Sequence, residues 1–151
     1  IIWARKKEKV AHYFNYELMK MINDDKQMTD VWRLPAIAPW EKSCGKHPTQ
    51  KPIGLLARII MASTEAGAWI LDPFAGSSTT GIAANLLGRR FLGIELQQEY
   101  AEMSMKRREE INRLETFARY KSKIADINKY DVGNQTSFAF AEDTAFEDLP
   151  F

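Results

Sequence analysis

The stretch Leu71-Asp72-Pro73-Phe74-Ala75-Gly76-Ser77-Ser78-Thr79-Thr80-Gly81 decides the fold of this 151-residue chain. Before it, the short apolar run 68–71 is typical of a strand buried on both faces of a parallel sheet. After it, apolar residues recur at helical spacing, which predicts a helix over 79–87 that ends at Gly88. A second strand is expected at 91–95. Strand, turn, helix and strand in this order predict a βαβ unit of an α/β fold.

The turn between the first strand and the helix has the chemistry of an anion and nucleoside site. Gly76 allows the backbone to approach a ligand closely, and the helix that follows offers unpaired N–H groups and its positive dipole end. Residues 77–80, all Ser or Thr, add hydroxyl donors. Glu95 follows Gly76 by 19 residues, where an acid accepts both hydroxyls of a ribose. Ser78 replaces the second glycine of a dinucleotide motif, which favours a mononucleoside-like ligand.

Outward from this unit, the sequence predicts two further helices. The first is expected over 52–63, because Pro52 suits a first helical turn and apolar residues follow at helical spacing. The second is a long helix over 97–120, with one apolar stripe and with the charged run 106–110 mostly in solvent. The stripe consists of Tyr100, Met103, Ile111, Leu114 and Phe117.

The two ends of the chain give weaker patterns. Residues 1–5 are expected to form a short strand and residues 10–28 an irregular, aromatic-rich segment. Five acidic residues and no Lys or Arg follow Lys129. Residues 121–151 are therefore expected to form an acidic tail that is poorly ordered.

Composition excludes several classes of protein. The formal net charge is +1, so the chain is not a histone-like polycation, although its mildly basic body permits contact with nucleic acid. A single cysteine, Cys44, excludes an internal disulfide and a multi-cysteine zinc site, and no metal site is predicted. No apolar run is long enough to span a membrane. These features favour a cytoplasmic protein without a membrane partner.

Three segments together resemble a known family. They are Gly45-Lys46-His47-Pro48-Thr49-Gln50-Lys51-Pro52, the stretch 71–81 and Gly93-Ile94-Glu95. Their order resembles the beta class of DNA amino-methyltransferases, which methylate adenine N6 or cytosine N4. The resemblance implies a partial Rossmann-like class I methyltransferase sheet, S-adenosyl-L-methionine as cofactor and double-stranded DNA as partner. It covers about residues 1–115 and favours adenine N6 as the target.

The resemblance also assigns roles to residues of this sequence. Phe74 would border the cofactor and Gly76 would make the close turn. Ser77 and Thr79 would hold the methionine carboxylate together with His47, and Glu95 would bind the ribose. The predicted cofactor-binding residues are therefore His47, Phe74, Gly76, Ser77, Thr79 and Glu95.

One expected motif is absent from these 151 residues. Enzymes of this class carry an Asp/Asn/Ser-Pro-Pro-aromatic tetrapeptide that binds the flipped base, and no such tetrapeptide occurs here. In the order that the resemblance implies, the motif would precede residue 1. The expected organisation is the end of a catalytic and target-recognition part over 1–46, a cofactor-binding part over 47–120 and the acidic tail over 121–151. No catalytic residue is assigned, and an N-terminal catalytic segment is an expected partner.

Several alternatives stay open. The chain could be a truncated, non-catalytic remnant, or the target could be cytosine N4. A small-molecule or RNA methyltransferase of the same fold is a further alternative, against which the segment 47–52 counts. A homodimer is also left open.

Overall fold

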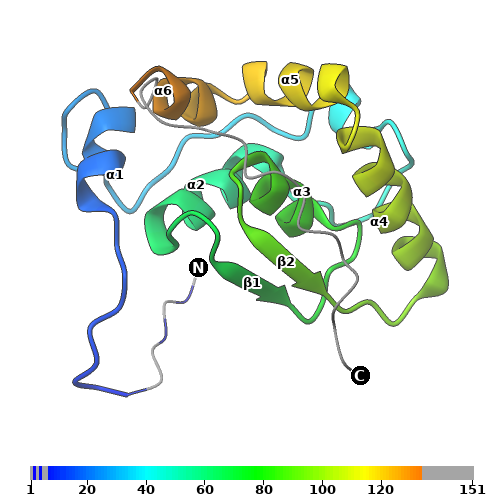
Figure 1. Cartoon of the computed structure of the whole chain (residues 1–151), viewed down its shortest axis with the longest axis horizontal. Coiled ribbons are helices and arrows are strands. Elements are labelled where there is room, and N and C mark those ends of the chain that lie inside the picture. Colours follow the sequence, from blue (N-terminus) through cyan, green and yellow to red (C-terminus); the bar gives the residue numbers. More distant parts are fainter. Residues whose placement is uncertain (1, 3, 5–6, 134–151) are drawn as a thin grey trace.

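The computed structural model of the chain describes residues 2, 4 and 7–133 (Figure 1). These residues form a small parallel sheet with helices on one side of it. The elements in order are α1 (Tyr16–Ile22), the 3-10 helix η1 (Pro39–Lys42), α2 (Ile53–Ser63), β1 (Trp69–Asp72), α3 (Thr79–Leu86), β2 (Arg90–Gly93), α4 (Gln98–Ile111), α5 (Leu114–Ser122) and α6 (Ala125–Gly133).

The sheet confirms the predicted βαβ unit. Strands β1 and β2 pair in parallel, from Trp69 opposite Arg90 to Asp72 opposite Gly93, and α3 connects them. The second strand begins one residue earlier than predicted and ends two residues earlier. The Ile94 amide still donates to the Asp72 carbonyl at 2.9 Å, which carries the pairing beyond β2. The chain after both strands therefore stays together, at the edge where ligands of such folds bind.

Helix α3 packs closely on β2 because Gly81 has no side chain. A Cβ atom at this position would lie 2.6 Å from the ring of Phe91. On its other side α3 packs against α2, whose fully buried residues recur every fourth position at Ile53, Ala57 and Met61. This spacing explains the predicted helix at 52–63, which the structure confirms at Ile53–Ser63.

One face of the sheet is open in the part of the chain that the structure describes. Trp69 and Leu71 of β1 are 63% and 61% exposed, and Leu92, which pairs with Leu71, is 56% exposed. The prediction of a strand buried on both faces is therefore wrong for β1 within these residues. The physical reason is that α3 covers one face and no described element covers the other.

The predicted long helix over 97–120 is wrong, because α4 ends at Ile111 and α5 begins at Leu114. Arg113 between them has extended backbone angles (φ −78°, ψ 125°), which no α-helix can include. The break rotates the second half, so Leu114 is exposed although the predicted stripe included it. The prediction that 106–110 lies in solvent is wrong for Arg107, which is 3% exposed.

The predicted disorder from residue 121 is wrong for residues 121–133, because α5 extends to Ser122 and α6 follows. Two ion pairs fix α6: Arg58 of α2 meets Asp126 at 2.7 Å, and Lys129 meets Asp24 after α1 at 2.7 Å. Figure 1 shows α5 and α6 in a row on the side away from the strands. The remainder of the predicted tail, 134–151, lies outside the described residues.

The N-terminal predictions also need correction. The segment 10–28, expected to be irregular, contains α1, whose first turn is capped by the Asn15 side chain. Residues 2 and 4 are not in a strand, and the other positions of the expected strand at 1–5 lie outside the described residues. Within the part of the chain that the structure describes, no helix has the length and apolarity to cross a membrane.

Candidate cofactor site

The turn after β1 is closed by the carboxylate of Asp72. One oxygen accepts the Phe74 amide at 3.1 Å, and the other accepts the Thr80 hydroxyl at 2.6 Å. The Thr80 hydroxyl is therefore used inside the turn and is not a free donor. Gly76 (φ +53°) and Ser78 (φ +56°) both adopt left-handed backbone angles. Serine thus occupies a conformation that favours glycine, which accounts for the glycine expected there in related turns.

Five of the six predicted residues line one cavity of about 210 Å³ at this turn. His47 comes from the loop before α2, Phe74 and Gly76 from the turn, and Ser77 and Thr79 from the start of α3. The ring of Phe74 is 87% exposed, so it is free to contact a ligand, whereas Ser77 and Thr79 are buried. The folded chain therefore brings His47 and Phe74, which are 27 residues apart in the sequence, to one small cavity.

His47 is oriented by contacts on two sides. Its Nδ1 accepts the Thr49 amide at 3.2 Å, and its ring packs on Tyr100 with 4.1 Å between centroids. Because Nδ1 is an acceptor, the neutral ring carries its proton on Nε2. A Cβ atom on Gly76 would lie 3.0 Å from that Nε2. Gly76 is thus needed both for its backbone angle and for the close approach of His47.

Glu95, the sixth predicted residue, lies on the other side of the turn. Its carboxylate accepts the Gly76 amide at 2.8 Å and the Gln97 amide at 2.9 Å, one on each oxygen. These backbone hydrogen bonds, led by the one from Gln97, lower the pKa of Glu95. Each oxygen keeps a lone pair for a further donor. Glu95 also lines a second cavity of about 370 Å³, formed by α3, β2 and α4, and its bond to Gly76 joins it to the first site.

The loop that carries His47 is held by buried polar groups. The carboxylate of Glu41 in η1 accepts the amides of Ala38 at 3.0 Å and of Ile53, the first residue of α2, at 2.8 Å. The Gln50 side chain donates to the Glu41 carbonyl at 2.9 Å. Gln50, which the sequence analysis used only as part of a motif, therefore anchors the loop at the wall of the cavity.

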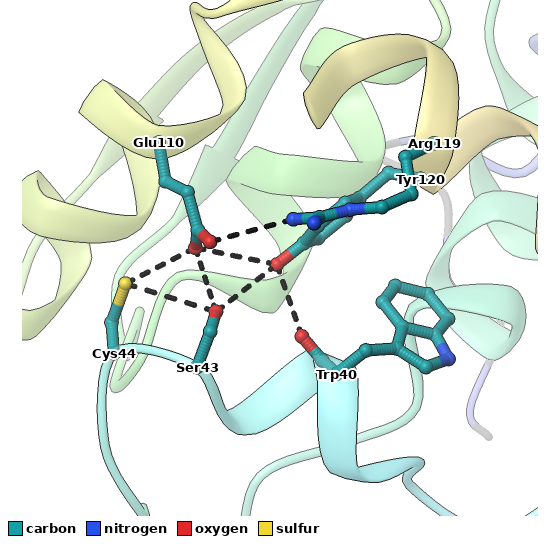
Figure 2. Close-up of polar contacts among 6 residues, drawn as sticks. All are labelled: Trp40, Ser43, Cys44, Glu110, Arg119 and Tyr120. Atoms are coloured by element: carbon teal, nitrogen blue, oxygen red, sulfur yellow. Dashed lines mark hydrogen bonds and ion pairs between the residues drawn. The ribbon is translucent and has the colours of Figure 1, made fainter. Parts of the chain in front are cut away.

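A second cluster attaches the same loop to α4 and α5 (Figure 2). Glu110 of α4 accepts hydrogen bonds from Ser43 at 2.7 Å and from the Cys44 thiol at 3.2 Å. The Tyr120 hydroxyl of α5 donates to the Trp40 carbonyl at 3.2 Å. Burial and the neighbouring carboxylate raise the pKa of Cys44, so its thiol stays protonated and is a poor nucleophile. This cluster positions the loop and offers no reactive group.

The sequence analysis did not predict that one face of α4 contacts the turn and the loop that carries His47. Tyr100 packs on His47, and the Ser104 hydroxyl donates to the Gly76 carbonyl at 2.8 Å. Arg107 donates through Nη1 to the Ser77 carbonyl at 2.6 Å. The three positions follow the i, i+4, i+7 spacing of one helix face. Arg107 lies midway between the apolar residues Met103 and Ile111, and this position was the signal that it is buried.

Comparison with known proteins agrees with this architecture. A family model described as DNA methylase matches residues 1–106. The type II methyltransferase M2.MboI of Moraxella bovis is 61% identical over 111 residues, which are 74% of this chain and 41% of that protein. M2.DpnII of Streptococcus pneumoniae is 58% identical over 113 residues, 74% of this chain and 42% of that protein. The chain thus spans about two fifths of the length of these curated relatives.

A solved structure is also similar. The crystal structure of the M1.HpyAVI–SAM complex matches with a TM-score of 0.53 and 36% sequence identity. The match covers 67% of this chain and 46% of the other. The small parallel sheet and its helices therefore correspond to part of the Rossmann-like fold of a methyltransferase.

Among the described residues, no group of three or more His, Cys, Asp or Glu side chains could hold a metal ion.

Proposed function

The chain belongs to the DNA methylase family, and we propose that it forms the S-adenosylmethionine-binding part of a site-specific DNA methyltransferase. The proposed reaction transfers a methyl group to an exocyclic amino group of double-stranded DNA, with adenine N6 as the target. The observation that carries the proposal is the single cavity that His47, Phe74, Gly76, Ser77 and Thr79 line, with Glu95 bonded to the same turn. The cytoplasm is the proposed location.

The donors and acceptors around the turn fit this cofactor. The methionine carboxylate would accept hydrogen bonds from the Ser77 and Thr79 hydroxyls and from His47 Nε2. The first N–H groups of α3 have no partner within their helix and add positive potential at the same place. The free lone pairs of Glu95 would accept the ribose hydroxyls, and the exposed Phe74 ring would cover an apolar part of the cofactor. S-adenosylmethionine supplies the methyl group on its sulfonium centre.

In the proposed enzyme, cofactor binding and base binding are carried by different segments. The 151 residues contain no Asp/Asn/Ser-Pro-Pro-aromatic tetrapeptide. We propose that residues 47–120 bind the cofactor, that residues 1–46 form the end of a catalytic and target-recognition part, and that methyl transfer needs a segment bearing the tetrapeptide. The open face of the sheet at Trp69, Leu71 and Leu92 is where such a segment would pack. The chain alone would then bind cofactor weakly and transfer no methyl groups.

The test has two stages. Binding of S-adenosylhomocysteine to the 151-residue chain is measured by isothermal titration calorimetry. The chain is then co-expressed with the part of M2.MboI that this chain does not match, and incorporation of tritiated methyl groups into DNA is followed. We expect weak binding by the chain alone and methyl transfer only by the combination.

Each outcome has a distinct reading. Absence of cofactor binding in both preparations contradicts the proposed function. Binding without restored transfer supports the alternative of a non-catalytic remnant. Methylation of cytosine N4 in the product, identified by mass spectrometry of the nucleosides, would correct the target base.

A further inference from the structure

A guanidinium group lies buried directly beneath the proposed carboxylate site. Arg107 of α4 is 3% exposed, and its Nη1 donates to the Ser77 carbonyl at 2.6 Å, the Ser77 hydroxyl at 3.1 Å and the Thr79 hydroxyl at 3.2 Å. All three acceptors belong to the turn that lines the 210 Å³ cavity. The other terminal nitrogen, Nη2, is buried and has no hydrogen-bond partner among the described residues.

Arg107 has no ion-pair partner within the described part of the chain. No carboxylate there lies within ion-pair distance of it. Two acids are near enough to interact with it, Glu41 and Glu110, but both have other hydrogen-bond partners. Burial of an unpaired cation is unfavourable unless an anion or strong hydrogen bonds offset it. An anion bound at the turn would provide the missing negative charge.

The hydrogen bonds also fix what the two hydroxyls can do. A guanidinium group can only donate, so the Ser77 and Thr79 oxygens act as acceptors toward it. Their own O–H hydrogens are left to donate elsewhere, and no acceptor for either is found among the described residues. Both side chains line the cavity, so an anion there would meet two hydroxyl donors.

From this arrangement we propose that Arg107 is a positioning residue for the methionine carboxylate of the cofactor. Acting through Ser77 and Thr79, it orients both hydroxyls as donors and adds positive charge behind the turn. The inference rests on the proposed function and adds to it a residue on α4 that does not itself line the cavity. It predicts that Arg107 affects the amino-acid end of the cofactor and not the nucleoside end.

The test compares two ligands that differ at that end. S-adenosylhomocysteine carries the carboxylate, whereas methylthioadenosine keeps the nucleoside and the sulfur but lacks the amino-acid group. Dissociation constants of both are measured by equilibrium dialysis with the wild-type 151-residue chain and with Arg107→Met, Arg107→Lys and Lys106→Met. Lys106 is exposed on the same helix, so its substitution removes the same charge without touching the turn.

We expect Arg107→Met to raise the dissociation constant of S-adenosylhomocysteine at least tenfold and to change that of methylthioadenosine by less than twofold. Arg107→Lys should weaken S-adenosylhomocysteine less than Arg107→Met does, because it keeps the charge but loses the fork of donors. Lys106→Met should change neither ligand.

If the Arg107 variants lose affinity equally for the two ligands, Arg107 has only a structural role and the inference is overturned. Unchanged affinity for S-adenosylhomocysteine would overturn it as well. If Arg107→Met does not fold, the ligand selectivity of Arg107→Lys decides between the same outcomes. Failure of the wild-type chain to bind either ligand, both alone and when co-expressed with the complementary part of M2.MboI, would instead contradict the proposed function.

Discussion

At the scale of single residues, Glu95 has two tasks that a substitution can separate. Its carboxylate holds the Gly76 amide and is also the proposed acceptor for the ribose. Glu95→Ala removes both interactions and should weaken the binding of S-adenosylhomocysteine about tenfold to a hundredfold, since hydrogen bonds to a charged group are lost. Glu95→Gln keeps one oxygen for Gly76 and should lose less. Calorimetry of both variants, with circular dichroism to confirm folding, checks this; unchanged affinity in Glu95→Ala would remove Glu95 from the site.

Gly76 gives a second prediction at this scale. Gly76→Ala places a Cβ atom 3.0 Å from His47 Nε2 and forces alanine into a left-handed conformation at φ +53°. Gly67→Ala is the matched control, because Gly67 has a similar φ of +74° but open space around its Cβ position. Both variants should lose about 1–2 kcal/mol of unfolding free energy from the backbone alone. Only Gly76→Ala should also lose cofactor binding, and equal binding in the two variants would contradict the role of the His47 contact.

At the scale of elements, the attachment of the 39–44 segment to α4 should depend on pH. Burial raises the pKa of Glu110, but hydrogen bonds from Ser43 and Cys44 and the charge of Arg119 outweigh it, so the net pKa lies below its ordinary value. A carboxyl group whose pKa is lowered on folding stabilises the folded state above its unfolded pKa of about 4.3. That contribution is lost as the pH falls from there through the lower pKa of the folded state.

Glu110→Gln should therefore reduce stability at neutral pH and flatten its fall in acid. Urea unfolding at a series of pH values from about 7 to about 3 measures both effects. Glu109→Gln is the control, because Glu109 is the exposed neighbour on the same helix. Parallel pH profiles for the wild type and Glu110→Gln would show that this cluster does not contribute.

The elements also show which features a sequence can predict. The βαβ unit followed from local patterns: a short apolar run, a turn rich in Gly, Ser and Thr, and an amphipathic helix. The break between α4 and α5 did not, because Asn112 and Arg113 between the two helices include no Gly or Pro. Burial of Arg107 was missed because a charge was taken as a sign of solvent, although its position fell on the apolar stripe. Helix α6 depends on ion pairs with distant residues, which local composition does not reveal.

At the scale of the whole molecule, the open sheet face should control association. Trp69, Leu71 and Leu92 expose apolar surface side by side, and such a patch favours self-association in water. The isolated chain is expected to be poorly soluble or oligomeric. Leu71→Lys should shift it toward the monomer in analytical ultracentrifugation without lowering the unfolding midpoint, since the side chain is already 61% exposed.

Leu114→Lys provides the comparison, because Leu114 is 78% exposed on α5, outside the sheet. It should leave association unchanged. If both lysine variants had the same effect, net charge rather than the sheet face would explain it. Methyl transfer by the combination of this chain with the complementary part of M2.MboI should fall in Leu71→Lys, because the same face is the proposed contact for that part.

The contact between α1 and α6 has a consequence for how genes of this kind can be rearranged. Lys129 of α6 donates to the Ile22 carbonyl at the end of α1 and pairs with Asp24, so the segment from Ile22 to Lys129 starts and finishes at neighbouring points. A segment whose ends lie together can be cut from one position in a coding sequence and joined at another with little distortion of its interior. Recombination would then move this unit as one piece. The order of the proposed cofactor-binding and catalytic parts along a gene would be free to change while their contacts stayed the same.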